Sequence, residues 1–404
     1  MSRLRPAALL FLTLVLLVTA SCGGAASRSS ASSTATAEPT PTTPAPTPRP
    51  APNYVIRGNL DRSRRKFEQS KVGRVAFLGG SVTTLAWREK VMAYLVQRFP
   101  NTTFDFINAG LSGTPAELGA FRLEEDVSSR GPVDLLFLEF AVNGGSLEAM
   151  EGIVRHARAL SPNIDIVQMH IAAQWFGDGL DKGQLPGAVV IHEQVAEHYG
   201  ICSLHLYQEI YDRVEAGEFT WDQFSADGVH PNAFGSTIYA DFIDGFLQVM
   251  WSGAAESPKT YSLPPPLSAD PWEHGSLIGY DKASSSHGFK TVTDWTIDTN
   301  INFKGPVSFI ASSTAGSTVT FSFRGTKVGL YEVAGPDSAK VDYQIDGGAW
   351  TELDTARDSM YPSDWYRLNG ILLNTSLTNG AHSITFKTRT DAGHVFRLYR
   401  LMVG

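Results

Sequence analysis

The pattern of hydrophobic and polar positions divides the chain into two parts. From about residue 53 to 252, short apolar runs alternate with longer amphipathic segments. Short apolar runs between turn residues are typical of buried strands, and apolar positions three to four residues apart are typical of helices. The alternation predicts βα units, in which a parallel sheet is covered by helices on both faces.

We expect strands at 75–78, 104–107, 135–138, 164–169 and 201–206. Helices are expected at 86–98, 116–126, 147–160, 189–199 and 233–249. Asn232 directly precedes the last of these and is a favourable N-cap residue. In sheets of this kind the catalytic groups lie at the carboxyl ends of the strands. We therefore expect candidate catalytic residues in the segments that directly follow the strands.

The pattern changes after Trp251. A Pro-rich linker at 256–271 is followed by segments in which apolar and polar residues alternate with a period of two, separated by Gly, Asn and Asp. Asp346-Gly347-Gly348 and Asn379-Gly380 are turn signals of the kind that join antiparallel strands. We therefore predict an α/β domain at 53–255 and an all-β sandwich at 272–404.

The N-terminus is typical of an exported chain. Arg3 and Arg5 precede an apolar stretch at 7–20 that is too short for a comfortable membrane span. The following Ala20-Ser21-Cys22 resembles the lipobox of bacterial lipoproteins, in which the cysteine is acylated. It predicts a signal peptide at 1–21, lipidation of Cys22 and an extracytoplasmic location at a membrane; an ordinary secretory signal is the alternative.

Residues 22–52 consist mostly of Ser, Thr, Ala and Pro and predict an extended tether. The chain of 404 residues has a net charge of -8, which disfavours non-specific binding to nucleic acid. Its two cysteines exclude a disulfide-rich scaffold and a four-cysteine zinc site. If Cys22 is acylated, Cys202 is left alone and is expected to be a buried core residue.

Four segments carry groups suited to nucleophilic catalysis. Gly79-Gly80-Ser81 ends the first expected strand and would expose a serine on a sharp turn. Asp227 and His230 lie three residues apart, so the carboxylate can orient the imidazole while its second nitrogen accepts the serine proton. Gly110 and Asn143 follow the second and third strands, where a main-chain N–H and a side-chain amide could bind an oxyanion.

Together these four segments resemble the SGNH, or GDSL, hydrolase superfamily over roughly residues 72–250. The resemblance implies a three-layer, flavodoxin-like α/β/α fold and the roles of nucleophile for Ser81, general base for His230 and orienting acid for Asp227. It implies an oxyanion hole made by the N–H groups of Ser81 and Gly110 and by the Asn143 side chain. It also implies no metal and no organic cofactor.

Two positions depart from the superfamily pattern. Gly80 stands before the serine, where the GDSL motif has Asp, and Gly144 follows Asn143, where the third conserved segment usually has Asp. Gly-Gly-Ser variants are familiar among members that look like carbohydrate esterases, whose jelly-roll accessory domains the β sandwich resembles. We therefore expect a serine esterase that removes acetyl or other short acyl groups from a polysaccharide or glycoconjugate. The alternatives are a lipase-like or lysophospholipase-like hydrolase, a thioester hydrolase, an acyltransferase and a non-enzymatic glycan-binding lipoprotein.

Other candidate residues are less specific. His192, Glu193 and His198 do not have the spacing of an HExxH zinc motif. His170 and His205 end the fourth and fifth strands and could border the cleft or be structural. Gly80, His170 and Trp175 are candidate substrate contacts, and the aromatic residues of the β sandwich could bind glycan or form its core. The sequence leaves the oligomeric state open.

Overall fold

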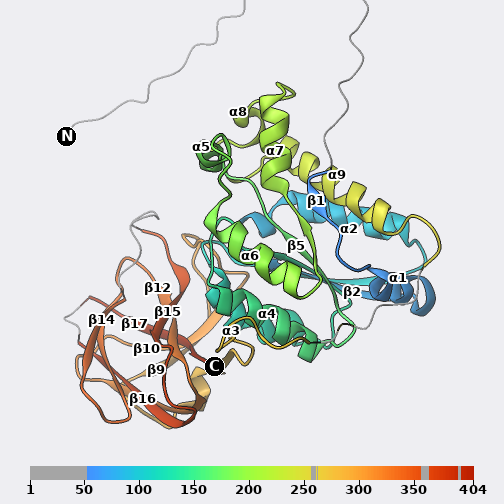
Figure 1. Ribbon diagram of the computed structural model, residues 1–404. Helices are drawn as coiled ribbons and strands as arrows, with labels where there is room; N and C mark the ends of the chain where they lie inside the picture. The colour runs from blue at the N-terminus through green and yellow to red at the C-terminus, as the bar shows by residue number, and fades with distance from the viewer. Residues whose placement is uncertain (1–51, 256–260, 262, 356–363, 390–392) are drawn as a thin grey trace, which may run out of the picture. The chain divides into compact units, whose positions relative to one another are not determined.

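The computed structural model describes residues 52–255, 261, 263–355, 364–389 and 393–404 (Figure 1). The predicted signal peptide, Cys22 and the tether up to residue 51 lie outside these residues and stay predictions. Among the described residues, no helix has both the length and the apolar character needed to cross a membrane.

The first domain is built on a six-stranded sheet in the order β1-β6-β5-β4-β2-β3. Its strands are β1 (Tyr54–Val55), β2 (Val72–Gly79), β3 (Thr103–Gly110), β4 (Leu135–Glu139), β5 (Asp165–Met169) and β6 (Cys202–Leu204). Strands β2 to β6 are parallel, as predicted, and their order is the flavodoxin-like one in which the second strand lies outside the first. The short edge strand β1 was not predicted and runs antiparallel to β6, so the sheet is mixed.

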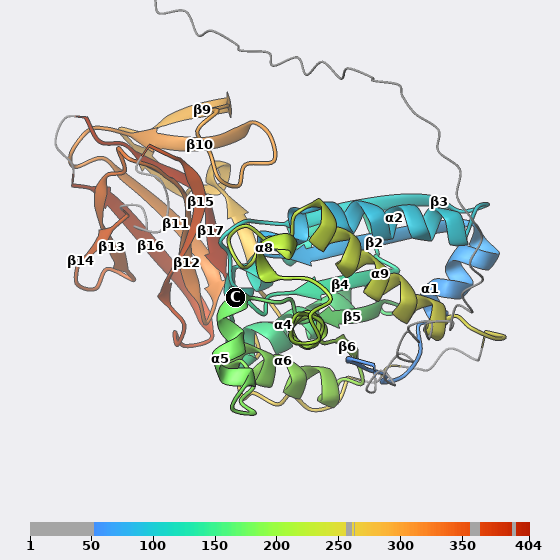
Figure 2. The same cartoon turned by 90° about the horizontal axis from the view of Figure 1, so that it is seen from above.

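Helices cover both faces of this sheet (Figure 2). The longer ones are α2 (Ala86–Arg98), α3 (Ala116–Leu123), α4 (Leu147–Leu160), α6 (Gly187–His198), α7 (Leu206–Glu215) and α9 (Ala233–Met250). The short ones are α1 (Asp61–Arg65), α5 (Gly177–Leu180) and α8 (Trp221–Phe224), with η1 (Lys66–Ser70), η2 (Val82–Thr84), η3 (Glu124–Ser128) and η4 (Gln174–Phe176). The expected cap of α9 is confirmed, because Asn232 Oδ1 accepts from the N–H groups of Phe234 and Gly235.

The burial of the strands explains why the sequence of this domain contains short continuous apolar runs. Along β2, Val75 and Phe77 pack in the core under α2 and α9, whereas Ala76 and Leu78 pack in the core under α3 and α4. Since both faces are buried, every position of the run must be apolar. Helix α7 was not predicted: the expected fifth strand ran to Leu206, but Leu206 begins α7 and β6 ends at Leu204.

The second domain is a sandwich of two antiparallel sheets, as predicted. One sheet has the order β15-β12-β17-β10-β9, with β7 paired to β17, and the other has the order β14-β13-β16-β11-β8. Its elements are β7 (Ser276–Gly279), η5 (Tyr280–Lys282), β8 (Ser285–His287), β9 (Lys290–Trp295), β10 (Val307–Ser312), β11 (Thr318–Gly325), β12 (Val328–Ala334), β13 (Lys340–Ile345), β14 (Thr351–Asp354), β15 (Arg367–Asn374), β16 (Gly380–Thr388) and β17 (Phe396–Val403). The predicted turn between β13 and β14 is confirmed: Asp346 and Gly347 have φ of 50° and 69°.

The two domains share buried side chains. The sheet that contains β12, β15 and β17 packs toward α3, so that Tyr331 and Met402 belong to the same apolar cluster as Phe121. Two polar contacts join the domains near the end of β3: Asn302 Nδ2 donates to the Ser112 carbonyl (3.2 Å) and Lys304 Nζ to the Asn108 carbonyl (2.6 Å). The segment Ala51–Gly404 forms one compact unit, and the boundaries predicted inside it stay predictions.

Candidate active site

The candidate nucleophile lies where strand β2 ends. The strand stops at Gly79, and Ser81 caps the 3₁₀ turn η2 with right-handed helical backbone (φ -64°, ψ -40°). Gly80 between them is buried, and a Cβ placed on it would lie 2.0 Å from Asn143 Oδ1. An aspartate at position 80, where the GDSL motif has one, would fit only if the Asn143 side chain moved.

Ser81, His230 and Asp227 form the chain of hydrogen bonds expected of a catalytic triad. The Ser81 hydroxyl lies 2.7 Å from His230 Nε2, and His230 Nδ1 lies 2.6 Å from Asp227 Oδ2. The loop between α8 and α9 brings His230 to a serine 149 residues earlier in the chain. With the Nδ1 proton on the aspartate side, Nε2 is free to accept the serine proton.

Asp227 is held as an anion by its own loop. Its Oδ1 accepts from the main-chain N–H groups of Val229 and His230 (3.0 and 2.8 Å) and from Ser225 Oγ (3.0 Å). Partial burial alone would raise the pKa of Asp227, but the hydrogen bonds from His230, Val229 and Ser225 outweigh it and hold the pKa well below its usual range. A carboxylate that stays ionised can orient the imidazole over the whole working range of pH.

The expected oxyanion donors are not equivalent. Asn143 lies beside Gly80, close to the nucleophile turn, and its side-chain amide makes no hydrogen bond with another described residue. Gly110 is level with Gly79 in the parallel ladder, as expected, but its N–H donates to Asn108 Oδ1 at 3.0 Å. The Gly110 N–H must therefore be shared or released before it can bind an oxyanion, whereas the Asn143 amide is available.

A buried glutamate under the nucleophile turn was not anticipated. Glu139 ends β4 and is 1% exposed. Its Oε2 accepts from the Gly80 N–H (3.3 Å) and from Thr83 Oγ1 (3.1 Å). Burial raises the pKa of Glu139 to about 7, although these hydrogen bonds lower it in part. A charged residue that closes the apolar run 135–138 was the signal in the sequence that could have identified it.

Arg122 was also missed. It lies on α3, is fully buried, and donates from Nη1 to the Ala109 carbonyl (2.6 Å) and from Nη2 to the Gly79 carbonyl (2.9 Å). These carbonyls belong to the residues directly before Gly80 and Gly110. Asp126 pairs with the same guanidinium at 2.6 Å. Arg122 thus joins the ends of β2 and β3 at the level of Ser81 and Gly110.

The two remaining candidate substrate contacts differ in position. Trp175 is 58% exposed, and its neighbour Gln174 donates its N–H to the Gly228 carbonyl of the triad loop (2.8 Å). His170 is fully buried, so the structure does not place it where it could contact a bound substrate.

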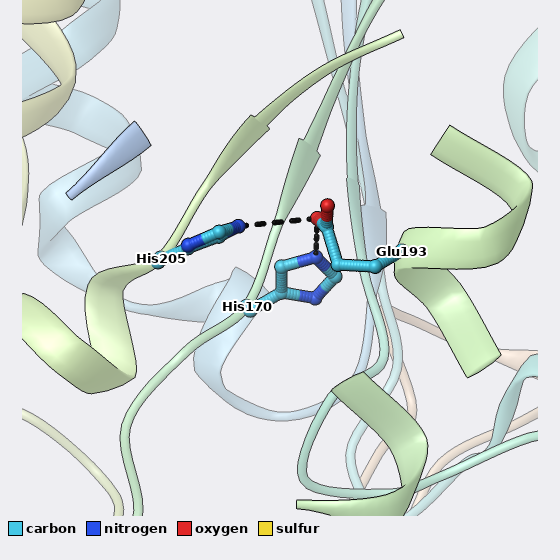
Figure 3. A group of neighbouring side chains, drawn as sticks. All are labelled: His170, Glu193 and His205. Carbon is cyan, nitrogen blue, oxygen red and sulfur yellow. Dashed lines mark hydrogen bonds and ion pairs between the residues drawn. The ribbon is translucent and has the colours of Figure 1, made fainter. Parts of the chain in front are cut away.

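His170 belongs instead to a cluster with Glu193 and His205 (Figure 3). His170 Nε2 and His205 Nε2 lie 2.7 and 3.2 Å from Glu193 Oε1, and Arg57 pairs with Glu193 Oε2 at 2.7 Å. Burial alone would raise the pKa of Glu193, but the hydrogen bonds from both histidines reverse this and lower it strongly. The carboxylate is therefore an anion shared by three donors.

These three side chains could in principle hold a metal ion, since their ligand atoms lie within 4.8 Å of one another. Two observations fit a metal poorly. Arg57 already balances the charge of Glu193, and His170 Nδ1, which a metal-bound imidazole would use to donate a hydrogen bond, is buried with no partner among the described residues. We interpret the cluster as a hydrogen-bonded anchor between β5, β6 and α6.

In the second domain, the aromatic residues divide between core and surface. Trp295 packs edge-on against Tyr366 at 5.2 Å, and both rings face the Arg397 guanidinium. Trp350 is 42% exposed, with Lys387 Nζ 4.0 Å from its ring centre. Tyr361 lies outside the described residues. The predicted glycan-binding role of these residues stays a prediction.

Comparison with known structures shows which fold the chain shares. No family model matches the chain, and no curated protein matches its sequence. A crystal structure of a two-domain esterase active on acetylated mannans matches 87% of this chain and 97% of its own, with a TM-score of 0.74 and 23% identity. The same kind of esterase co-crystallised with mannopentaose matches 87% of this chain and 96% of its own, with a TM-score of 0.72 and 24% identity. The chain therefore has the two-domain fold of these esterases, with the three-layer α/β architecture expected from its SGNH-like segments followed by a β sandwich.

Proposed function

We propose that the chain is a serine esterase that removes acetyl or other short acyl groups from a polysaccharide or glycoconjugate. The observation that carries the proposal is the chain of hydrogen bonds from Ser81 through His230 to Asp227, with distances of 2.7 and 2.6 Å. A degenerate triad in a binding protein would have no reason to keep these distances. The mannan esterases with the same fold support the carbohydrate as the alcohol part of the ester.

The reaction follows from the geometry. The Ser81 hydroxyl attacks the ester carbonyl and gives its proton to His230 Nε2, and the tetrahedral oxyanion forms next to Asn143. When the intermediate collapses, the C–O bond of the ester breaks and His230 Nε2 returns the proton to the leaving sugar hydroxyl. A water molecule then gives a proton to His230 Nε2 and attacks the acyl-enzyme. As this second intermediate collapses, the bond to Ser81 Oγ breaks, His230 returns the proton to Oγ, and the carboxylic acid is released.

The proposal is tested by hydrolysis of p-nitrophenyl acetate, butyrate and octanoate. We expect turnover of the acetate that falls as the acyl chain lengthens, and a loss of at least about 10³-fold in Ser81→Ala. Ser129→Ala, at an exposed turn residue, is the matched control and should keep full activity. A preference for the octanoate would favour the lipase-like alternative, and no turnover above Ser81→Ala on any ester would refute the proposal.

We also propose that the protein acts outside the cytoplasm, attached to a membrane through acylated Cys22. The resemblance of the first 22 residues to a lipoprotein signal and the Ser/Thr/Pro-rich segment after it support this location. A tether of about 30 residues would let the esterase reach polymers beyond the membrane surface.

A further inference from the structure

A surface groove of about 580 Å³ lies next to the loop that carries Asp227 and His230. It is formed where α7 ends and α8 begins, together with η4 after β5. The lining residues that bear on its chemistry are Gln174, Glu218, Thr220, Trp221, Asp222 and Gln223. Its volume is within the range of about 300–1,000 Å³ found for small-molecule sites.

The groove is directly connected to the catalytic loop. The Gln174 N–H donates to the Gly228 carbonyl (2.8 Å), and Gln174 Oε1 lies 2.7 Å from the position of a Cβ on Gly228. On the other wall, α8 ends one residue before Ser225, whose hydroxyl donates to Asp227. A ligand in the groove would therefore lie against the loop that supplies the base and the orienting acid.

The wall around Trp221 is rigid. Thr220 and Gln223 form a capping box at the start of α8: Gln223 N donates to Thr220 Oγ1 (3.3 Å), and Thr220 N donates to Gln223 Oε1 (2.9 Å). Trp221 packs edge-on against buried Phe224, with ring centres 5.7 Å apart. The indole and the Gln223 amide are thus held in place before a ligand binds, which reduces the entropy lost on binding.

Aromatic side chains are concentrated around this loop. Among the described residues, the large hydrophobic side chains that are exposed include three aromatic ones, Trp175, Phe234 and Trp350. Trp175 follows Gln174 directly, and Phe234 lies on the first turn of α9, four residues after His230. Trp175 and Phe234 do not line the groove itself, but they place two exposed aromatic rings on the segments that flank the catalytic loop.

The chemistry of the lining favours a neutral ligand with many hydroxyl groups. Asp222 is acidic, Glu218 is acidic but pairs with Arg213 at 2.8 Å, and no Lys or Arg is among the described lining residues. The lining thus offers no free cation to a phosphate or to nucleic acid. Amide, hydroxyl and carboxylate groups beside an indole ring can bind the hydroxyl groups and the apolar face of a sugar ring. Val214 and Phe219 add apolar surface to the lining, but an acyl chain in the groove would bury the polar groups without partners, which is costly.

We propose that this groove binds the sugar units that flank the acylated one in the substrate, with Trp221 and Gln174 as contact residues. This inference rests on the proposed function, because it takes the ester that Ser81 cleaves to be carried by a glycan chain. According to this proposal, the α/β domain itself recognises the glycan substrate.

The test compares a substrate that has flanking sugars with one that has none. Chemically acetylated mannopentaose and xylopentaose are compared with p-nitrophenyl acetate for the full-length protein and for Trp221→Ala and Gln174→Ala. The quantity compared is the ratio of kcat/KM on an acetylated pentaose to kcat/KM on p-nitrophenyl acetate. For at least one of the two pentaoses, we expect this ratio to fall about tenfold in each variant, mainly because KM rises. Trp221→Phe should restore most of the ratio, and Leu185→Ala, at an exposed site on the segment before α6, should leave it unchanged.

Direct binding separates this inference from the proposed function. Mannopentaose and xylopentaose without acetyl groups are titrated into the wild-type protein and Trp221→Ala in a calorimeter. Binding that weakens about tenfold in Trp221→Ala would support the groove even if no ester were hydrolysed. An unchanged substrate ratio in both variants on both pentaoses, an equal loss on all substrates, or binding that does not depend on Trp221 would overturn the inference while leaving the esterase proposal intact.

Discussion

Gly80 and Asn143 are so close that a side chain at position 80 would have to displace the Asn143 amide. A Cβ on Gly80 would lie 2.0 Å from Asn143 Oδ1, well inside van der Waals contact. The nucleophile turn and the oxyanion loop therefore fix each other's position. The glycine that departs from the superfamily motif belongs to the same arrangement as the asparagine that matches it.

Gly80→Ala should reduce activity much more than it reduces stability. The added methyl group must push Asn143 away, which misplaces the oxyanion donor, and crowding of this kind costs about 1–3 kcal/mol. The measurement is kcat on p-nitrophenyl acetate together with urea unfolding. Gly187→Ala is the control, since a Cβ there has no neighbour within 4 Å; activity equal to wild type in Gly80→Ala would contradict the close packing.

Asn143→Ala should lower kcat by about 10²- to 10³-fold with little change in KM. The Asn143 amide is the side-chain donor next to the nucleophile turn, and removal of one preorganised oxyanion donor costs about 2.7–4 kcal/mol of transition-state stabilisation. Asn101→Ala, at an exposed turn residue, serves as the control. A loss below tenfold would assign the oxyanion to main-chain donors, including the Gly110 N–H after its release from Asn108.

The triad could be predicted from the sequence because each of its members lies in a short segment with its own signal. Ser81 follows two glycines at a strand end, and Asp227 and His230 are close enough to pair within one loop. The local spacing of these residues was therefore enough to predict the triad. The same holds for α2 and α4, whose observed bounds are the predicted ones.

The supporting residues could not be predicted, because their roles depend on contacts across the fold. Arg122 reads as a residue of an amphipathic helix, and only the pairing of β2 with β3 shows that it reaches two carbonyl groups. His170 ends a strand, so from the sequence it could border the cleft or be structural. The structure shows it fully buried, with Nε2 2.7 Å from Glu193 Oε1. The spacing of residues in the sequence does not show whether a side chain at the end of a strand is exposed or is covered by neighbouring elements.

Cys22→Ala should release the protein from the membrane. If Cys22 is acylated, its acyl chains supply the membrane attachment at about 0.8 kcal/mol per buried CH₂ group. The measurement is the distribution between membrane and soluble fractions of cells that express the wild type or the variant. Ser21→Ala keeps a small residue before the cysteine and should stay in the membrane; equal membrane retention of Cys22→Ala would refute lipidation.

Arg122→Leu should destabilise the protein and lower kcat together. The variant removes the charged donor of the buried Gly79 and Ala109 carbonyls. The Gly79 carbonyl keeps the Leu111 N–H (2.9 Å), so the expected cost is that of lost hydrogen bonds to a charged group, about 1.5–3 kcal/mol. Urea unfolding and kcat on p-nitrophenyl acetate measure the two effects. Arg130→Leu removes a half-exposed arginine that pairs with Asp105 and should cost less than about 1 kcal/mol, and a similarly small effect of Arg122→Leu would contradict its role at the strand ends.

Glu139 should make the stability of the protein depend on pH. Its folded-state pKa of about 7 lies above the usual 4.5, so the folded state binds more protons than the unfolded state between these values. The stability gained from the protonated carboxyl group is fully present below about pH 4.5 and is lost as the pH rises through 7. Glu139→Gln, which cannot titrate, should lack this loss, which is on the order of 3 kcal/mol for a shift from 4.5 to about 7.

Urea unfolding of the wild type and Glu139→Gln at pH 4.5, 6 and 8 measures the effect. The wild type should lose stability relative to the variant at each step, because the ionised carboxylate becomes costly in its buried site. Glu197→Gln, on the exposed side of α6, is the control and should follow the wild type at every pH. A constant difference between the wild type and Glu139→Gln across this range would show that Glu139 is already ionised at pH 4.5, and that the N–H of Gly80 and the hydroxyl of Thr83 stabilise its charge enough to offset burial.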